Sequence, residues 1–407
     1  MAVNLEGIRI IETATVIAGP MAGRFLADWG ADVIHVDHVT RKAIEARREA
    51  AEKKTNRIIF PGLDPLSQNA GRNKRAIMLD LSRERGREVM LKLLSKADVL
   101  LSNFRPYELE KFGLEYATLS KIYPRLICAN LTGYGKKGPY RNAPAYGQIA
   151  GDARSGLLNS LRAPGSFPPQ TSGTLTDLIT ASNFACGILA ALLIRERTGV
   201  GQEVEVSLFN SMVFALAGDI AATITTGRSR RTVERKDLPN ALSGMYETKD
   251  GRWLILGLGP QSVAYWPRFC KALERTELEN DSRFDSIEHR TANNLDMFNI
   301  LERVFKTKTL EEWKPRLDES GIPWSPLQDF TEIFDDPQAR ANDFFIQFED
   351  PNYGRVEVVA NPIKLSKAPA YIRTNTPGFG QHTDEILREY GYTETEIEQL
   401  AEQGVIA

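Results

Sequence analysis

Strand-like and helix-like segments alternate through the amino-terminal half of the chain. The β-branched segment IRIIETA is followed by PMAGRFLADWG, which suits a short helix ending at Gly30, and then by the strand-like ADVIHVD. The pattern recurs with RAIMLDL, the helical ERGREVMLKLLSKA, DVLLSNF and LICANLTGYG. Repeated βαβ units predict an α/β fold in which a mostly parallel sheet is flanked by helices.

The alternation of strand-like and helix-like segments breaks off after the apolar helical segment that ends at Arg197. A charged stretch runs from Arg228 to Lys236, and GMYETKDGRWLILGLG then has the form of a hairpin. Strand and helix signals return after Phe330. We therefore predict one α/β domain over about the first 200 residues and a smaller α+β domain that begins after the charged stretch and ends near Phe330.

Composition excludes several classes of function. Lys and Arg number 51 against 53 Asp and Glu, so no overall charge attracts nucleic acid or an anionic membrane. The longest apolar run is shorter than the roughly 20 residues that cross a bilayer, and the first residues do not resemble a signal peptide. Three scattered cysteines and four histidines form no metal-ligand spacing. We expect a cytoplasmic protein without a metal site.

A glycine-rich segment follows the predicted strand LICANLT. Residues 133–138, GYGKKG, match the G-x-G-x-x-G spacing of dinucleotide-binding turns. Such a turn must open a helix, yet Pro139 and Pro144 follow and no helix-forming run begins. The sequence favours a flexible glycine loop at the carboxyl end of a strand, and this loop is our candidate for stabilising an oxyanion.

Asp177 precedes the apolar helix predicted at 178–197 and is placed at its N-cap. Aspartate is a favoured N-cap because its carboxylate accepts amide hydrogen bonds, so a purely structural role explains it. The alternative is that the helix dipole keeps the carboxylate ionised for nucleophilic attack on an activated carbonyl.

The order of motifs along nearly the whole chain resembles the family III CoA-transferases, of the formyl-CoA transferase and carnitine-CoA transferase type, in the CaiB/BaiF superfamily. The resemblance rests on these segments: LEGIR at 5–9, AGP at 18–20, LADWGADVI at 26–34, NKR at 73–75, NFRP at 103–106, TGYG at 132–135, Asp177, LAAL at 189–192, TGVGQ at 198–202, GIP at 321–323 and GQHT at 380–383.

This resemblance implies a particular architecture. The large domain would be Rossmann-like and built from both chain ends, residues 1–208 and 333–407. A linker at 209–232 and a small α+β domain at 233–332 would lie between them, and two subunits would thread each other as an interlocked dimer. A homodimer is expected, and a heterodimer with a paralogue stays open. No nucleic-acid or membrane partner is implied.

The resemblance also assigns roles to residues. Asp177 would be the nucleophile, and Tyr146 matches an active-site tyrosine of formyl-CoA transferase. Acyl-CoA would be a substrate, with no tightly bound cofactor. The implied CoA-contacting residues are Val16, Ile17, Ala18, His38, Asn73, Lys74, Arg75, Asn103, Phe104 and Lys111. The substrate and oxyanion positions are Gly133, Tyr134, Gly135 and Tyr146.

Two departures from formyl-CoA transferase bear on the substrate. Ile17 stands where that enzyme has glutamine, and its small-domain glycine run is missing near Leu242-Ser243-Gly244. We therefore expect an acceptor larger or more apolar than oxalate, such as a 2-hydroxy acid, an aryl-substituted acid like benzylsuccinate, or a carnitine-like acid, with succinyl-CoA or another acyl-CoA as donor.

The implied reaction passes through an aspartyl-acyl anhydride and an aspartyl-CoA thioester. An isomerase of the α-methylacyl-CoA racemase type is the first alternative, but its catalytic histidine would fall near Tyr146, and tyrosine is a poor base at neutral pH. One subunit of a heteromeric CoA-transferase is the second.

Overall fold

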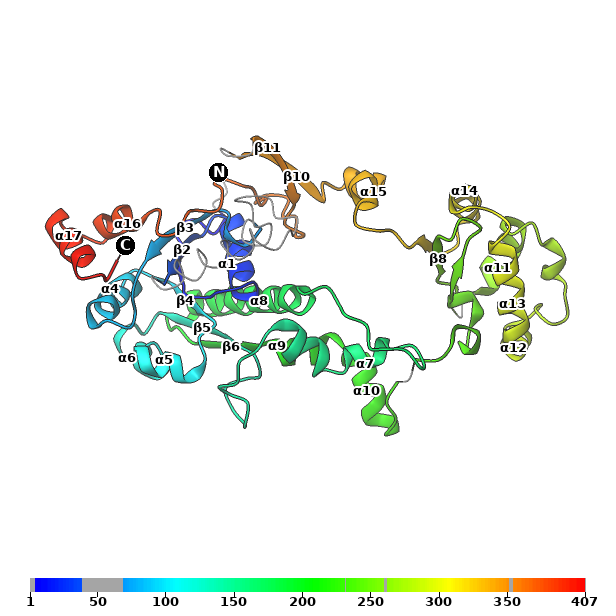
Figure 1. Ribbon diagram of the computed structural model, residues 1–407, viewed down its shortest axis with the longest axis horizontal. Helices are drawn as coiled ribbons and strands as arrows, with labels where there is room; N and C mark the ends of the chain where they lie inside the picture. Colours follow the sequence, from blue (N-terminus) through cyan, green and yellow to red (C-terminus); the bar gives the residue numbers. More distant parts are fainter. Residues whose placement is uncertain (1–3, 39–68, 231, 260–261, 351–353, 407) are drawn as a thin grey trace, which may run out of the picture. The chain divides into compact units, whose positions relative to one another are not determined.

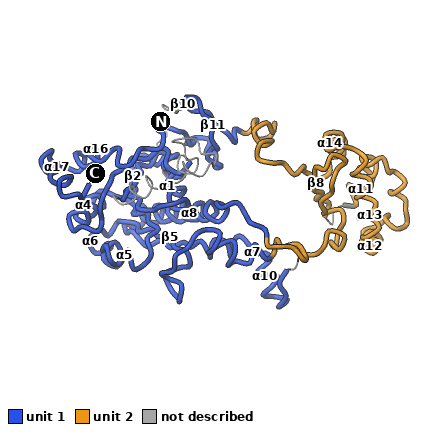
Figure 2. Tube along the Cα trace, viewed as in Figure 1, with its two compact units in different colours: residues 1–159, 169–230, 343–407 blue, residues 160–168, 231–342 orange. Residues whose placement is uncertain are grey.

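The chain forms two compact units (Figure 2). The larger comprises residues 1–159, 169–230 and 343–407, and the smaller comprises 160–168 and 231–342. The fold is taken from a computed structural model, which describes residues 4–38, 69–230, 232–259, 262–350 and 354–406.

The larger unit is built on a six-stranded sheet whose strands all run parallel. Their order across the sheet is β3-β2-β1-β4-β5-β6, so the α/β class predicted from the sequence is confirmed. The strands are β1 (Arg9–Glu12), β2 (Asp32–Asp37), β3 (Lys74–Met78), β4 (Val99–Ser102), β5 (Ile127–Thr132) and β6 (Glu203–Ser207).

Helices cover both faces of this sheet (Figure 1), which is why its strands carry apolar residues on both sides. The helices of this unit are α1 (Ala18–Asp28), α4 (Glu84–Leu94), α5 (Pro106–Phe112), α6 (Tyr116–Ile122), a π-helix (Gly147–Ala153), α7 (Leu157–Leu161), α8 (Leu175–Thr198), α9 (Leu208–Ala215), α10 (Ala217–Thr226), α16 (Thr383–Glu389) and α17 (Glu394–Glu402).

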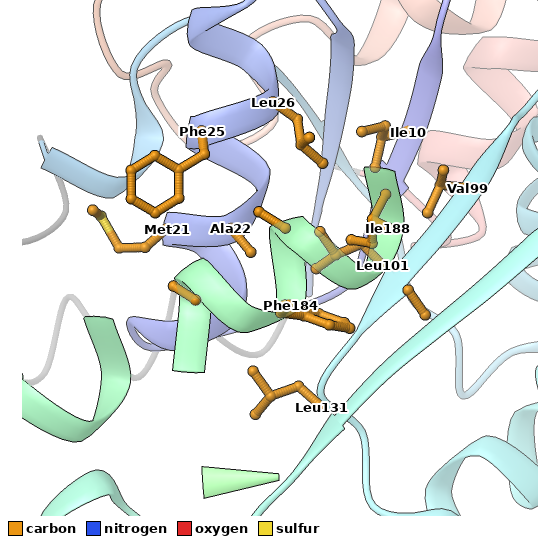
Figure 3. Packing of buried hydrophobic residues seen from close by; sticks show 14 of the residues in the cluster. Ile10, Met21, Ala22, Phe25, Leu26, Val99, Leu101, Leu131, Phe184 and Ile188 are labelled. Carbon is orange, nitrogen blue, oxygen red and sulfur yellow. The ribbon is translucent and has the colours of Figure 1, made fainter. Parts of the chain in front are cut away.

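Alternate residues of each strand enter different cores. Ile10 of β1 packs with α1 and α8, whereas Ile11 packs with α4, α16 and α17. Figure 3 shows the first of these cores, in which Phe184 of α8 lies between the sheet and α1. Both faces of the sheet are thus fixed by buried contacts, so the carboxyl ends of its strands form a rigid platform.

The carboxyl-terminal segment completes the larger unit. The amide of His382 donates to the carbonyl of Ala76 in β3 (2.9 Å), and the amide of Met78 donates to Thr383 Oγ1 (3.1 Å). A hairpin of β10 (Phe345–Asp350) and β11 (Gly354–Val359) precedes this segment. Both chain ends therefore contribute to one unit.

The smaller unit has an antiparallel sheet in the order β7-β8-β9, packed against helices around Trp313, Phe269 and Tyr246. Its strands are β7 (Met245–Glu247), β8 (Trp253–Leu256) and β9 (Trp324–Pro326). Its α-helices are α11 (Ser262–Ala272), α12 (Ile287–Ala292), α13 (Asn294–Phe305), α14 (Leu310–Ser320) and α15 (Pro337–Ala341), and its 3₁₀ turns are 235–237, 241–243, 276–279 and 332–335.

The linker predicted at 209–232 is wrong over most of its length. Residues 208–226 form α9 and α10, which belong to the larger unit. The reason is local: Ser207 caps α9 by accepting a hydrogen bond from the amide of Asn210 (3.2 Å), and the apolar run after it sustains two successive helices.

By length and composition alone, α8 is long and apolar enough to cross a membrane, and α9 with α10 pass the same test as a pair bent by 73°. This is weak evidence, because core helices of water-soluble proteins satisfy the same criteria. The part of α8 that passes this test is 44% buried, and Phe184 and Ile188 within it are fully buried against the sheet and α1.

Candidate active site

The strand order reverses between β1 and β4, whose connections leave the sheet in opposite directions. In open α/β sheets, ligands bind outside the carboxyl ends of the strands at this switch point. The loops after β1 and β4 carry Val16 and Asn103, two of the predicted CoA-contacting residues. These two loops are therefore the first place to look for a site.

The loop after β1 is held in an unusual conformation. Val16 is 55% exposed and has φ of 71°, in the left-handed region that β-branched residues rarely adopt. Asn103 clamps the preceding residue, since its Oδ1 accepts from the Thr15 amide (3.0 Å) and its Nδ2 donates to the Thr15 carbonyl (2.8 Å). Ile17 and Ala18 follow at once and begin α1. The structure thus brings Val16, Ile17, Ala18 and Asn103 together.

We expect Asn103→Ala to raise the KM for acyl-CoA about tenfold, because two hydrogen bonds worth about 1 kcal/mol each no longer hold the strained loop. Initial rates at varied acyl-CoA concentration measure this. Asn103→Asp keeps the acceptor for the Thr15 amide but sets a carboxylate oxygen against the Thr15 carbonyl in place of the donor, so it should raise KM at least as much. Unchanged KM in Asn103→Ala would show that the clamp does not shape the CoA site.

The first turn of α8 lies at the same end of the sheet. The far end of α8 is tied to the start of β4, since Arg195 Nη1 lies 2.8 Å from Asp98 Oδ1, so its first turn faces the carboxyl ends of the strands. Asp177 is in that turn, but the N-cap is Thr174, and the helix begins at Leu175. The prediction that Asp177 is the N-cap is therefore wrong: the helix starts three residues earlier because Leu175 and Thr176 continue its turn.

A π-helix packs directly on this turn. Its first residue, Gly147, approaches so closely that a Cβ there would lie 2.6 Å from Asp177 Oδ2. Gly151 lies against Thr176, the residue before Asp177, since a Cβ at Gly151 would lie 2.2 Å from Thr176 Oγ1. Tyr146 precedes the π-helix, with a ring 63% exposed. π-helices are rare and frequently mark functional sites.

Asp177 is only 8% exposed, and no described residue donates a hydrogen bond to its carboxyl group. Burial, and then the neighbouring carboxylate of Asp152, raise its pKa to about 6. This is opposite to the direction expected if an N-cap and the helix dipole stabilised the charge. The group is a buried, poorly solvated carboxylate that is still mostly ionised at pH 7, which suits a nucleophile.

If Asp177 is the nucleophile that the resemblance implies, kcat/KM should fall as the pH drops below about 6, by about tenfold per pH unit, because protonation neutralises its carboxylate. Initial rates between about pH 4.5 and 8, on enzyme shown by circular dichroism to stay folded, measure this limb. A profile that stays flat down to pH 5 would contradict the assignment of Asp177.

The glycine loop lies beside these groups. A Cβ at Gly133 would lie 2.2 Å from the Cβ of Ala145, directly before Tyr146. The amide of Gly135 donates to Thr132 Oγ1 (2.9 Å) and that of Lys136 to Glu205 Oε1 (2.7 Å), so neither is available to an oxyanion in this conformation. Tyr134 packs against Tyr140 at 5.6 Å between ring centroids. The oxyanion role of this loop stays a prediction, without support for Gly135.

Three other predicted CoA-contacting residues follow β2 or β4. His38 comes directly after β2, with Nε2 3.6 Å from Asp80 Oδ1. Phe104 is half-buried and packs on Phe112, 5.5 Å between ring centroids, while Lys111 is exposed on α5 with its ammonium over the same Phe112 ring. These residues share the carboxyl side of the sheet with Val16, and their contact with CoA stays a prediction.

The remaining predicted CoA residues lie at the start of β3 and are already engaged. Lys74 is buried, with Nζ 2.8 Å from both carboxylate oxygens of Glu12 and 2.7 Å from the carbonyl of Pro20. Arg75 pairs with Asp32 (2.7 Å) and Glu389 (2.8 Å). The predicted contact of these cations with CoA phosphates is untested, and the burial of Lys74 argues against it.

Asn73 makes hydrogen bonds that hold other parts of the protein in place. Its Nδ2 donates to Asp28 Oδ1 (2.7 Å), and its Oδ1 accepts from the amides of Arg373 (2.6 Å) and Thr374 (3.1 Å). Asn73 therefore ties the carboxyl-terminal segment to the sheet. It lines a cavity of about 1290 Å³ with Arg75 and Arg373, on the side of the sheet where the strands begin, and Asp177 is not among the lining residues.

Sequence reasoning missed the residues that surround Asp177. Gly147, Gly151 and Asp152 come from the π-helix, and Arg154 at its end stacks over Tyr140 at 4.1 Å. The one available signal was the pair of glycines four residues apart in YGQIAGD. In the part of the chain that the structure describes, no group of three or more His, Cys, Asp and Glu could hold a metal ion.

Comparison with known proteins places these observations in context. A family model described as CoA-transferase family III matches residues 5–383. Cinnamoyl-CoA:phenyllactate CoA-transferase of Clostridium sporogenes is 34% identical over 403 residues, covering 97% of this chain and 95% of that protein. (R)-2-hydroxy-4-methylpentanoate CoA-transferase of Clostridioides difficile is 31% identical and covers 99% of both.

A solved structure agrees with these matches. The crystal structure of a CaiB/BaiF family protein from Brucella suis superimposes with a TM-score of 0.79 at 28% identity, over 95% of this chain and 99% of that one.

Proposed function

Because this chain belongs to CoA-transferase family III, we propose that it moves CoA from an acyl-CoA donor to a 2-hydroxy carboxylic acid, with Asp177 as the nucleophile. One observation carries the proposal: a carboxylate with a pKa of about 6 lies almost buried in the first turn of α8, at the carboxyl side of the sheet. Ligands of open α/β sheets bind on that side.

In the first half of the reaction, the donor's acyl group is transferred to Asp177, and CoA then takes the place of the acyl group there. An oxygen of Asp177 attacks the thioester carbonyl, the C–S bond breaks, and CoA leaves as thiolate, which gives a mixed anhydride. The thiolate then attacks the Asp177 carbonyl of the anhydride. This forms an aspartyl-CoA thioester and releases the donor's carboxylate.

The second half repeats these steps in reverse with the acceptor. The acceptor carboxylate attacks the aspartyl-CoA thioester and expels the thiolate, and the thiolate then attacks the acceptor carbonyl of the new anhydride. Acceptor-CoA leaves, and the Asp177 carboxylate is regenerated. No ATP is needed because the free energy of the thioester is retained. The burial of Asp177 supports this route, because water that reached either anhydride would hydrolyse it.

The class of acceptor is inferred from the relatives. Phenyllactate and 2-hydroxy-4-methylpentanoate, which appear in the names of the two relatives, both carry a hydroxyl beside the carboxylate and an apolar side chain. The replacement of a polar residue by Ile17 beside Val16 agrees with an acceptor of this kind. The choice between an aryl and an alkyl side chain is left to the experiment.

The proposal is tested by incubating the protein with acyl-CoA alone, quenching, and mapping covalent adducts by mass spectrometry of peptides. An adduct on the peptide that contains Asp177 is expected. A panel of 2-hydroxy acids, with glutarate, oxalate and carnitine for comparison, then identifies the acceptor by formation of its CoA ester. An adduct at another residue would refute the nucleophile assignment.

We also propose that two copies interlock. Support comes from the larger unit, which contains both chain ends, and from apolar side chains that are exposed in the single chain, including Phe214 (72%) and Ile224 (79%) of α9 and α10. If the copies thread each other, neither leaves without unfolding, so exchange between tagged and untagged dimers should take many hours. Native mass spectrometry of the mixture measures this. Exchange within minutes, or an active monomer, would contradict interlocking.

A further inference from the structure

A second buried carboxylate lies near the proposed nucleophile. Asp152 of the π-helix is fully buried. Its two oxygens accept hydrogen bonds from the hydroxyls of Thr171 and Thr176, and among the described residues no Lys, Arg or His pairs with it. A buried carboxylate held only by neutral donors is costly to the fold, so its presence calls for an explanation.

The geometry links this carboxylate to Asp177. Thr176, which donates to Asp152, directly precedes Asp177 in the first turn of α8. Gly147 and Gly151 bring the π-helix against this turn at distances that no larger residue allows. Asp152 therefore fixes the position of the turn and at the same time places a negative charge near the nucleophile.

The other ionisable groups on the described elements that pack against α8 are engaged elsewhere. The segments LFNSMVFA of α9 and GQIAGDA of the π-helix contain no ionisable side chain other than Asp152. On β5, burial raises the pKa of Cys128 to about 12, so its thiol is neutral. Arg24 on α1 pairs with Asp28 (3.2 Å), and on β6 Glu203 pairs with Lys136 while Glu205 accepts from the Lys136 amide (2.7 Å). Arg154, directly after the π-helix, stacks over Tyr140 (4.1 Å). Burial, and then the charge of Asp152, raise the pKa of Asp177.

We propose that Asp152 is a positioning residue for Asp177: through Thr176 it anchors the nucleophile's turn, and through its charge it favours the acylated, uncharged forms of Asp177 over the free carboxylate. This inference rests on the proposed function of the site. When Asp177 is held as the aspartyl-CoA thioester and the donor's carboxylate has been released, the negative charge beside Asp152 is gone and the repulsion ends. Asp152 thereby raises the equilibrium yield of the aspartyl-CoA thioester.

The charge of Asp152 should shift the equilibrium for acylation of Asp177 as much as the equilibrium for its protonation, because both reactions neutralise the same carboxylate. Asp152→Asn keeps the shape and an acceptor oxygen but removes the charge. We expect the pKa of Asp177 to fall by about one unit. The acid limb of kcat/KM should move down by the same amount, and the ratio of acylated to free Asp177, at a fixed ratio of acyl-CoA to CoA and acid, should fall about tenfold.

Thr171→Val is the matched control, because it removes a hydrogen bond to the same carboxylate and keeps the charge. If Asp152 only braces the structure, the two variants will behave alike and neither will shift the acid limb downward, which would overturn the proposal. If Asp152 acts as proposed, the downward shift appears in Asp152→Asn alone.

A direct titration separates this inference from the proposed function. Infrared difference spectra of the carboxyl bands, recorded without any CoA ester, give the pKa of Asp177 by comparison of the wild type with Asp177→Asn. The same titration of Asp152→Asn, or of Asp152→Ser if the asparagine variant does not fold, should give a lower pKa for Asp177 than in the wild type. An unchanged pKa of Asp177 refutes the coupling, whereas absent labelling of Asp177 by acyl-CoA refutes only the transferase mechanism.

Discussion

Replacing Asp177 with asparagine is expected to lower kcat by about 10⁴-fold or more, because the amide cannot form the anhydride on which both halves of the reaction depend. Transfer of CoA from donor to acid, followed by chromatography of the CoA esters, measures the loss. Asp177→Ala should be equally inactive, which excludes slow deamidation as a source of residual rate. Full activity in either variant would remove Asp177 from the mechanism.

The same asparagine substitution is expected to stabilise the fold. Burial and Asp152 raise the pKa of Asp177 to about 6, so the folded state binds a proton more readily than the unfolded chain does. The free energy of unfolding carries no penalty from this group below about pH 4, and it loses about 2–3 kcal/mol as the pH rises through 6. Asp177→Asn should recover that amount at pH 7.

Denaturant unfolding of both proteins at pH 7 and at about pH 4 checks this. The difference in stability should be present at pH 7 and vanish at pH 4. A gain that persists at pH 4 would mean that the effect comes from packing, and not from the charge. Loss of function with gain of stability is the signature of a residue kept for chemistry.

The second large effect is expected from Gly147→Ala. The new methyl carbon would lie 2.6 Å from Asp177 Oδ2, closer than atoms in contact tolerate, so the carboxylate must turn aside or the π-helix must retreat. A misplacement of about 1 Å at a reacting group costs roughly 10²-fold in rate, and we expect kcat to fall by about that factor while the KM for acyl-CoA changes little.

Gly173→Ala is the matched control, because it lies four residues before Asp177 and a Cβ there meets no atom within 4 Å. Its activity should stay within twofold of the wild type. If Gly147→Ala and Gly173→Ala are equally active, the close approach of the π-helix does not shape the nucleophile's position.

The fold followed from the sequence where local patterns decide the outcome. Adjacent apolar residues such as Ile10 and Ile11 face opposite cores, so the strands of a doubly covered sheet appear as continuous apolar runs, and the alternation of these runs with helical segments indicated parallel pairing. The extra helices after Ser207 were missed because the charged residues further on suggested a linker that begins only after Thr226.

The site was harder to predict, because its partners are far apart in the sequence. The resemblance predicts that Lys74 contacts CoA, yet Lys74 is buried against Glu12, which lies 62 residues earlier on a strand that β2 separates from β3. Asp152 gave no signal because it is 24 residues from Thr176, and it matters only through the π-helix that brings them together. Spacing within one helix is visible in a sequence, whereas burial of a distant pair is not.

The order in which the larger unit is completed has a consequence for biosynthesis. β3 is made early, whereas α16 and α17, which share a core with Ile77 and its neighbours, are made some 300 residues later. Until then α4, α5 and α6 leave part of this apolar face open to water, and the nascent chain carries an aggregation-prone surface. Chaperones that shield apolar surface should therefore bind the nascent chain until α16 and α17 have been made.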